Sequence, residues 1–251
     1  TLPALTTNLT FPLDNLSPVS EPVNPCGKEM KVVPGDARTV VVAVARHTID
    51  SRSCVFNDPD GVAIYQNGTK LPNTWTGFPF AHLLEFSEAP SLLFGVDRYA
   101  GSLSRFSVTA SGLSLIDSDT FTNWPGRDFK FLNGLLYSAT GQVVNGTTYS
   151  VVGSFTSSGM FNQVFSIRPD ATSKRLFAVT VQGLDESVAT VQAFDVNTLS
   201  LIGSLDIPGL AMTAIPQYPR YSSLARWGSD GLAFRTSSDE VVIIRSPLVG
   251  P

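Results

Sequence analysis

Short runs of apolar or alternating residues, separated by polar turns, fill most of the chain. The stretch 224–249 (LARWGSDGLAFRTSSDEVVIIRSPLV) shows this pattern most clearly. An apolar segment ends at Trp227, a Gly/Ser/Asp turn follows, residues 232–236 alternate, and residues 241–244 are a β-branched run. The pattern predicts three short antiparallel strands. Such a unit does not bury both faces of its own sheet, so it requires similar units beside it.

Similar groups of strands recur upstream. The second strands of five groups begin near Val40, Leu92, Leu135, Leu176 and Leu232, at intervals of 52, 43, 41 and 56 residues. Three outer strands share a Ser-apolar-apolar-x-Ser core, at residues 114–118, 150–154 and 200–204. A period of roughly 40–50 residues with four short strands in each is the signature of a β-propeller. No stretch has helical periodicity longer than a turn or two.

We therefore predict an all-β fold, a β-propeller of four-stranded antiparallel blades, with about five blades in a single domain over residues 1–251. The blades are expected at about 26–77, 78–124, 128–160, 162–209 and 216–249.

Three segments are expected to be less regular. Alternation over residues 9–13 predicts a strand, so residues 1–14 would complete the last blade or a preceding one. Residues 47–61 are predicted to be a long polar loop, and residues 69–77 a weak outer strand.

Composition limits the setting and the partners. Charged residues make up 15% of the chain and the net charge is −4, whereas typical soluble domains have about 25% charged residues. A surface rich in Ser, Thr, Asn and Gln suits an extracellular sheet protein. There is no basic stripe to bind nucleic acid. No apolar stretch reaches the ~18–20 residues of a membrane span, and the start of the sequence has no signal-peptide pattern, so the chain is a mature product or a piece of a longer one.

Cys26 and Cys54 are the only cysteines. They are interpreted as one disulfide, which in the loop-entropy model contributes roughly 3–4 kcal/mol; two unpaired thiols are the alternative. Neither has His or acidic partners at ligand spacing, so no metal site and no cofactor are predicted.

Five phrases together resemble a group of secreted bacterial β-propeller proteins whose repeats are of the YVTN or surface-layer type. They are KVVPGDARTVVVAVAR (31–46), GVAIYQNGTKLP (61–72), NGLLYSATGQVVNG (133–146), FDVNTLSLIGSLDIPG (194–209) and the stretch 224–249. The resemblance covers nearly the whole chain. It implies a secreted or cell-surface location. Longer members carry further upstream blades, typically seven in all, so the chain is expected to close as five blades, as a monomer, or to lack about two blades. The group has no established catalytic motif, so no functional residue is transferred.

Basic and aromatic residues of the last unit are the main candidate ligand-binding residues. If Arg226, Arg235 and Arg245 converge on one face, they could hold an anionic sugar or a carboxylate, together with Arg220, Lys174 and Arg175. Alternation places Arg235 and Arg245 on solvent faces as readily. The tryptophans Trp75, Trp124 and Trp227 lie at strand ends or loops, where they would stack on sugars if exposed or form wedges between blades if buried.

Other candidates have weaker patterns. His47 and His82 are the only histidines and lie at strand ends; His82 is kept as a ligand-binding candidate, and a catalytic base is the less favoured interpretation of either. The acidic stretch 57–61 resembles part of a calcium loop but lacks the first carboxylate, which favours an Asx-rich turn. The carboxylates Asp117 and Asp119, with Asp97 and Arg98, could do acid/base chemistry, although solvated strand charges fit them better.

These observations favour a non-enzymatic extracellular binding or scaffold module that contacts a glycan or protein through loops on one face of the ring. The alternative is a propeller enzyme of the lactonase or glycan-lyase type, with a site over the central channel. Fold alone does not separate these functions. The predicted inner strands contain few acids or histidines, so no catalytic residue is assigned.

Overall fold

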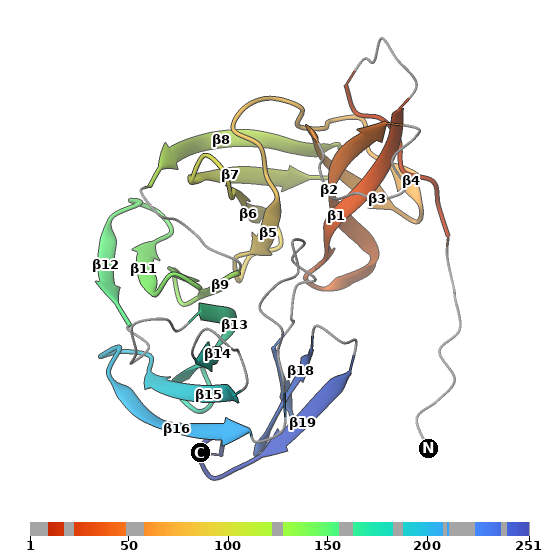
Figure 1. The fold of residues 1–251 in the computed structure, drawn as a ribbon. Coiled ribbons are helices and arrows are strands. Elements are labelled where there is room, and N and C mark those ends of the chain that lie inside the picture. Colours follow the sequence, from red (N-terminus) through yellow and green to blue (C-terminus); the bar gives the residue numbers. More distant parts are fainter. Residues whose placement is uncertain are drawn as a thin grey trace. The chain divides into compact units, whose positions relative to one another are not determined.

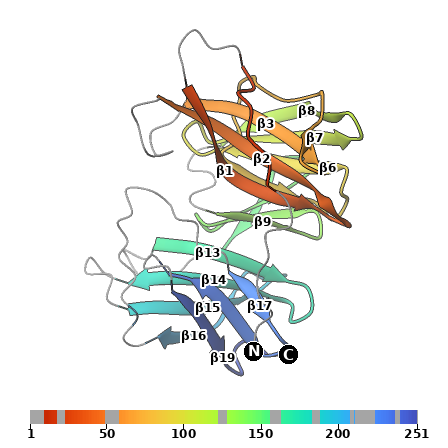
Figure 2. The same cartoon turned by 90° about the vertical axis from the view of Figure 1, so that its right-hand side faces the viewer.

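The computed structural model describes residues 10–17, 23–48, 58–121, 128–155, 163–182, 188–207, 210, 224–236 and 240–250. In this part of the chain all the regular structure is β-strand, arranged in five antiparallel sheets (Figures 1 and 2). The described residues contain no helix that could cross a membrane. The chain divides into two compact units, residues 1–121 and residues 122–251.

The first unit contains two four-stranded sheets. The first sheet has the order β1 (Val23–Val33), β2 (Asp36–Thr48), β3 (Asp58–Gln66) and β4 (Thr69–Lys70). The second has the order β5 (Leu83–Phe86), β6 (Leu92–Asp97), β7 (Ser102–Thr109) and β8 (Gly112–Thr120). In both sheets each strand pairs antiparallel with the next strand in sequence, as a propeller blade does.

The second unit repeats the same meander. Its first sheet is β9 (Phe129–Leu132), β10 (Leu135–Ser138), β11 (Gln142–Asn145) and β12 (Val151–Ser154). Its second is β13 (Gln163–Asp170), β14 (Arg175–Gln182), β15 (Val188–Asp195) and β16 (Leu201–Ile207). Its third is β17 (Ala225–Trp227), β18 (Gly231–Arg235) and β19 (Val241–Arg245). The all-β class and the antiparallel blade architecture are therefore confirmed.

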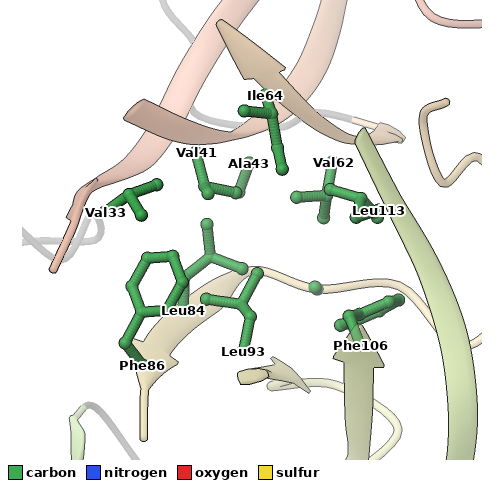
Figure 3. Close-up of a cluster of buried hydrophobic side chains, with 11 residues drawn as sticks. Val33, Val41, Ala43, Val62, Ile64, Leu84, Phe86, Leu93, Phe106 and Leu113 are labelled. Carbon is green, nitrogen blue, oxygen red and sulfur yellow. The ribbon is translucent and has the colours of Figure 1, made fainter. Parts of the chain in front are cut away.

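The second strand of a sheet supplies side chains to two separate cores. In β2, Val41 and Ala43 point into a core shared with the second sheet, whereas Val42 and Val44 point to the opposite face. Figure 3 shows the shared core, in which Val41 and Ala43 meet Leu84, Phe86, Leu93, Phe106 and Leu113. Each such side chain contributes about 1.5–3 kcal/mol when fully buried. The continuous β-branched run of β2 is thus explained by burial on both faces.

The same alternation occurs in the second unit. Leu176 and Ala178 of β14 pack with side chains of β10, β11 and β15, whereas Phe177 and Val179 pack with those of β15, β18 and β19. The sheet β13–β16 is therefore covered by a sheet on each face.

Polar side chains connect the first strands of consecutive sheets. In the first unit, Oε2 of Glu29 accepts a hydrogen bond from the N–H of Leu84 (2.7 Å). In the second, Oδ2 of Asp128 accepts bonds from the hydroxyl of Ser166 (2.9 Å) and the N–H of Ile167 (3.1 Å). The Ser166 hydroxyl in turn accepts from the N–H of Leu224 (3.2 Å). These first strands are edge strands, so the acceptors satisfy N–H groups that no strand can pair.

The repeated Ser-apolar-apolar-x-Ser motif forms a β-bulge. The register shifts by one residue in β8, β12 and β16, so that Ile116, Val152 and Ile202 are the extra residues. The two consecutive apolar residues in β12 and in β16 are exposed.

The glycine of this motif leaves room for a side chain from the next sheet. A Cβ on Gly153 would lie 2.8 Å from Cδ1 of Leu199, and a Cβ on Gly203 would lie 3.1 Å from Cδ1 of Leu248.

Two predicted boundaries were wrong. Strand β2 continues to Thr48 and β3 begins at Asp58, and the Arg46–Asp58 pairing extends the hairpin into the predicted loop and Asx-rich turn. The predicted outer strand over 69–77 is only two residues long, β4. Beyond it the chain turns back, and the backbone of Trp75 bonds both ways with Val62 (2.8 and 2.9 Å).

The strand predicted over residues 9–13 is absent from its described part, residues 10–13. Phe11, Leu13 and Leu16 instead pack on the outward face of β2 and β3, where the Phe11 ring stacks on Tyr65 at 4.8 Å. Residues 1–9 lie outside the described residues, so the completion of a blade by residues 1–14 stays a prediction. Cys26 lies in β1 and Cys54 lies outside the described residues, so the disulfide stays a prediction, as do the single closed domain and its monomeric state.

Asp128→Ala should lower the free energy of unfolding by about 2–3 kcal/mol, because it leaves buried donors of Ser166 and Ile167 without an acceptor. Urea denaturation followed by circular dichroism measures the loss. The matched control is Asp119→Ala, whose carboxylate is exposed and bonds to the adjacent N–H of Thr120. Equal, small losses in the two variants would contradict a role for Asp128 in joining the sheets.

Candidate functional site

A pocket of about 370 Å³ lies in the second unit, between the turn after β13 and the turn after β17. Its volume is within the range of small-molecule sites. Six residues line it: Asp170, Thr172, Ser173, Arg226, Gly228 and Ser229.

The turn after β13 is held by the carboxylate of Asp170. Its Oδ2 accepts hydrogen bonds from the backbone N–H (3.1 Å) and the hydroxyl (2.5 Å) of Ser173, and Lys174 ends the turn at a left-handed φ of 52°. Burial raises the pKa of Asp170, but the bonds from Ser173 and the charge of Arg226 outweigh burial and hold the pKa below its ordinary value. Asp170 is therefore an anion at neutral pH.

Arg226 lies in β17 and is fixed on several sides. Its guanidinium donates to the carbonyls of Val249 (2.7 Å) and Ser229 (2.6 Å), and its Nε lies 3.6 Å from Oδ2 of Asp170. Its Cζ lies 6.0 Å from the centroid of the Phe177 ring. Gly228, with a left-handed φ of 66°, begins the turn that brings the Ser229 carbonyl within reach.

A second arginine binds the same C-terminal turn. Arg175 donates to the carbonyls of Pro247 (3.3 Å), Leu248 (2.6 Å) and Gly250 (2.5 Å). Together with Arg226, it satisfies the carbonyls of residues 247–250, and Val249 is buried in the core between the last two sheets. Sequence reasoning missed this anchor, because backbone carbonyl acceptors have no sequence signature.

The structure separates the predicted ligand residues of the last sheet onto its two faces. Arg226 shares a row with Leu232 and Ile244, and that row faces the core. Trp227 and Arg245 share the next row, across Gly231, on the opposite face. Trp227 is 43% exposed.

The other charged residues of that opposite face lie apart from the pocket. Nε of Arg245 lies 4.0 Å from Asp230 on the surface. Arg235 pairs with Val241 at the far end of the sheet and is exposed. Thus only Arg226 of the predicted set lines the pocket, and Arg220 lies outside the described residues.

His82 belongs to the first unit and is buried. Its Nδ1 lies 3.4 Å from Oδ1 of Asp97, and its ring packs edge-on against Tyr99 at 5.0 Å. Asp97 also accepts from the N–H groups of Tyr99 (2.9 Å) and Ala100 (3.1 Å). Burial raises the pKa of Asp97, but His82 and these two N–H groups outweigh burial and lower it. The His82–Asp97 pair therefore supports the turn after β6, and the His47 side chain lies outside the described residues.

The remaining acidic candidates are already bound within the chain. Asp60 is buried, its carboxylate accepts from the N–H groups of Leu16 (2.5 Å) and Ser17 (3.0 Å), and its Oδ1 lies 3.5 Å from Nε of Arg46. Asp117 is bound by two nitrogens of Arg105, one at 2.7 Å. Within the described residues no group of three or more His, Cys, Asp or Glu side chains is placed to hold a metal ion.

Of the two interpretations of the tryptophans, Trp75 fits the wedge. It packs partly buried against the core of the first unit, 6.0 Å from the Phe106 ring, and its Nε1 donates to the carbonyl of Pro79 (3.1 Å). Trp124 lies outside the described residues.

Comparison with solved structures places the chain among β-propellers. It is similar to the Cps50 (Swd1) β-propeller domain of Myceliophteria thermophila, with 15% identity over 82% of this chain and 62% of that one, at a TM-score of 0.53. It is also similar to the Dos1 propeller (11% identity, 90% and 56% coverage, TM-score 0.59) and to Kuenenia stuttgartiensis hydrazine synthase (11% identity, 97% and 67% coverage, TM-score 0.60).

At these identities the likeness defines the fold alone: the chain is a β-propeller. The chain spans about three fifths of the length of the first of these structures. No protein-family model matches the sequence, and no curated protein is similar enough to match it.

Acid should destabilise the fold through Asp97 and Asp170. Their lowered folded pKa values stabilise the protein above the unfolded value of about 3.9, and this contribution is lost as the pH falls through the folded pKa values. Urea unfolding at a series of pH values should show a free energy that is steady down to about pH 5 and then falls. Asp170→Asn should be less stable at neutral pH and should lose less below about pH 4. An unchanged pH dependence in that variant would contradict the role given to Asp170.

Proposed function

We propose that the protein is a non-enzymatic extracellular binding or scaffold module, and that the pocket formed by Asp170 and Arg226 contacts a glycan. One observation carries this proposal: both charged groups of the pocket are fixed by bonds within the chain before any ligand enters. Binding sites gain affinity when their polar groups need no reordering on association. Hydroxyl groups of Thr172, Ser173 and Ser229 complete a lining suited to a polyhydroxylated ligand.

The chemistry of the lining favours binding over catalysis. A general acid or base works best with a pKa near the working pH, and the pKa of Asp170 is lowered away from that range. A nucleophilic hydroxyl needs a neighbouring base, and the six lining residues include no histidine or lysine. These features support a receptor pocket rather than a lactonase or lyase site.

The extracellular setting rests on composition and on the predicted disulfide. The low content of charged residues and the abundance of Ser, Thr and Asn suit a secreted or cell-surface protein. A disulfide persists in such oxidising surroundings.

Filling the pocket should abolish glycan binding without unfolding the protein. Ser229 is exposed, so Ser229→Trp places an indole over the pocket and leaves the core intact. On an array of neutral and acidic glycans, the variant should lose at least about tenfold of the signal of the parent protein. Ala110→Trp, in the exposed turn between β7 and β8, is the matched control and should bind normally. Equal binding by both variants would place the ligand elsewhere.

Cys26 and Cys54 should be joined in protein secreted through an oxidising compartment. Alkylation under denaturing conditions followed by mass spectrometry should find no free thiol before reduction and two after it. Reduction should lower the free energy of unfolding by roughly 3 kcal/mol, because it removes the constraint on the unfolded chain. Two alkylated thiols in unreduced protein would refute the disulfide.

A further inference from the structure

We propose that the pocket takes a neutral sugar, held through a pair of neighbouring hydroxyl groups, and that it discriminates against acidic sugars. This inference rests on the proposed glycan-binding function and replaces the anionic ligand that the arginine cluster suggested from sequence. The observation behind it is that Arg226 does not face the pocket alone: the carboxylate of Asp170 lines the same space.

The charges that line the pocket cancel. Nε of Arg226 lies 3.6 Å from Oδ2 of Asp170, so the guanidinium already has its counterion. An acidic sugar that approached Arg226 would meet the Asp170 carboxylate as well. Two like charges this close in a partly buried site repel each other, and this repulsion opposes most of the attraction to the arginine.

Among the described residues near the pocket, two further cations, Arg245 and Lys174, have an acidic neighbour, and a third, Arg175, has its donors taken by backbone carbonyls. Asp230 follows the lining residue Ser229 and lies within 4.0 Å of Arg245. Lys174 lies near Asp195. Hydrogen bonds from backbone N–H groups are the main reason that the pKa of Asp195 is lowered, and the charge of Lys174 lowers it slightly further. Arg175 donates to three carbonyls of the C-terminal turn.

The hydrogen-bonding groups of the pocket match a diol. A guanidinium has five N–H donors, and the carbonyls of Val249 and Ser229 use two of those of Arg226. The carboxylate of Asp170 only accepts; Ser173 and Arg226 approach it through Oδ2, and the backbone N–H of Thr172 also bonds to it, which leaves room for a further donor at an oxygen with two lone pairs. A sugar hydroxyl accepts and donates at once, so two adjacent hydroxyls can accept from Arg226 and donate to Asp170. A sugar carboxylate can satisfy the first group but not the second, and an acidic sugar that binds through its ring hydroxyls still brings its negative charge close to Asp170.

Matched pairs of sugars test the inference on the intact chain. Galactose and glucose are titrated against galacturonic and glucuronic acid by calorimetry at neutral pH, and a neutral oligosaccharide of each hexose shows whether the free sugar or a polymer end binds better. We expect each neutral sugar to bind at least about tenfold more tightly than its acid. Asp170→Asn removes the repulsion and one acceptor, so it should weaken the neutral sugars and strengthen the acids.

Three outcomes decide between the proposals. Tighter binding of the neutral sugars, with reversal in Asp170→Asn, supports the inference, provided that a thermal melt shows the variant folded. Acids that bind as well as or better than the neutral sugars, with binding lost in Ser229→Trp, would overturn the inference and leave the glycan-binding function standing. Absence of binding by every sugar would overturn both. Should Asp170→Asn fail to fold, Asp170→Glu, which keeps the charge, should retain the preference for neutral sugars.

Discussion

The structure depends on one constraint: the middle strands have apolar side chains on both faces. Alternate residues of β2 and of β14 enter two different cores, so each of these sheets must be covered twice. Within the second unit, sheets on either side cover β13–β16. Within the first unit, a sheet covers one face of β1–β4 and the segment containing Phe11 and Leu13 packs on the other. A sheet with two apolar faces needs a similar sheet packed on each side, and this requirement produces the repeated blades.

The candidate site lies where the sheet β13–β16 and the sheet β17–β19 are joined, and the contacts that join them also form the site. The first strand β17 has one open edge, and Arg226 on that strand bonds to the turn after β19 and faces the turn after β13. The Asp170 carboxylate that shapes one turn also compensates the charge of this arginine. A rigid donor and a rigid acceptor therefore lie side by side in the pocket, which is an arrangement that suits recognition of hydroxyl groups more than acid/base chemistry.

The sequence predicted the blades well because the alternation of apolar and polar residues within a strand and the residue types of a turn are both local properties of the sequence. The strands β6, β14 and β18 lie within a residue or two of the predicted runs, and Arg226, one of the predicted ligand-binding residues, lines the pocket. Asp170 was not singled out, because an aspartate that begins a turn looks the same with or without an arginine opposite it. Placement of Trp227 away from Arg226 follows from strand alternation, but the face that is buried depends on Leu232 and Ile244 packing against the neighbouring sheet.

Amide chemical-shift mapping with a neutral hexose is the most direct test of the account, because it locates a ligand without altering the protein. If the pocket binds the sugar, saturable shifts should be concentrated at the amides of Ser173, Gly228 and Ser229, with little change at Tyr99 or in the turn between β7 and β8. Two results would contradict the claim that this pocket is the functional site. One is saturable shifts confined to other residues, and the other is no shift at sugar concentrations well above the dissociation constants typical of lectins.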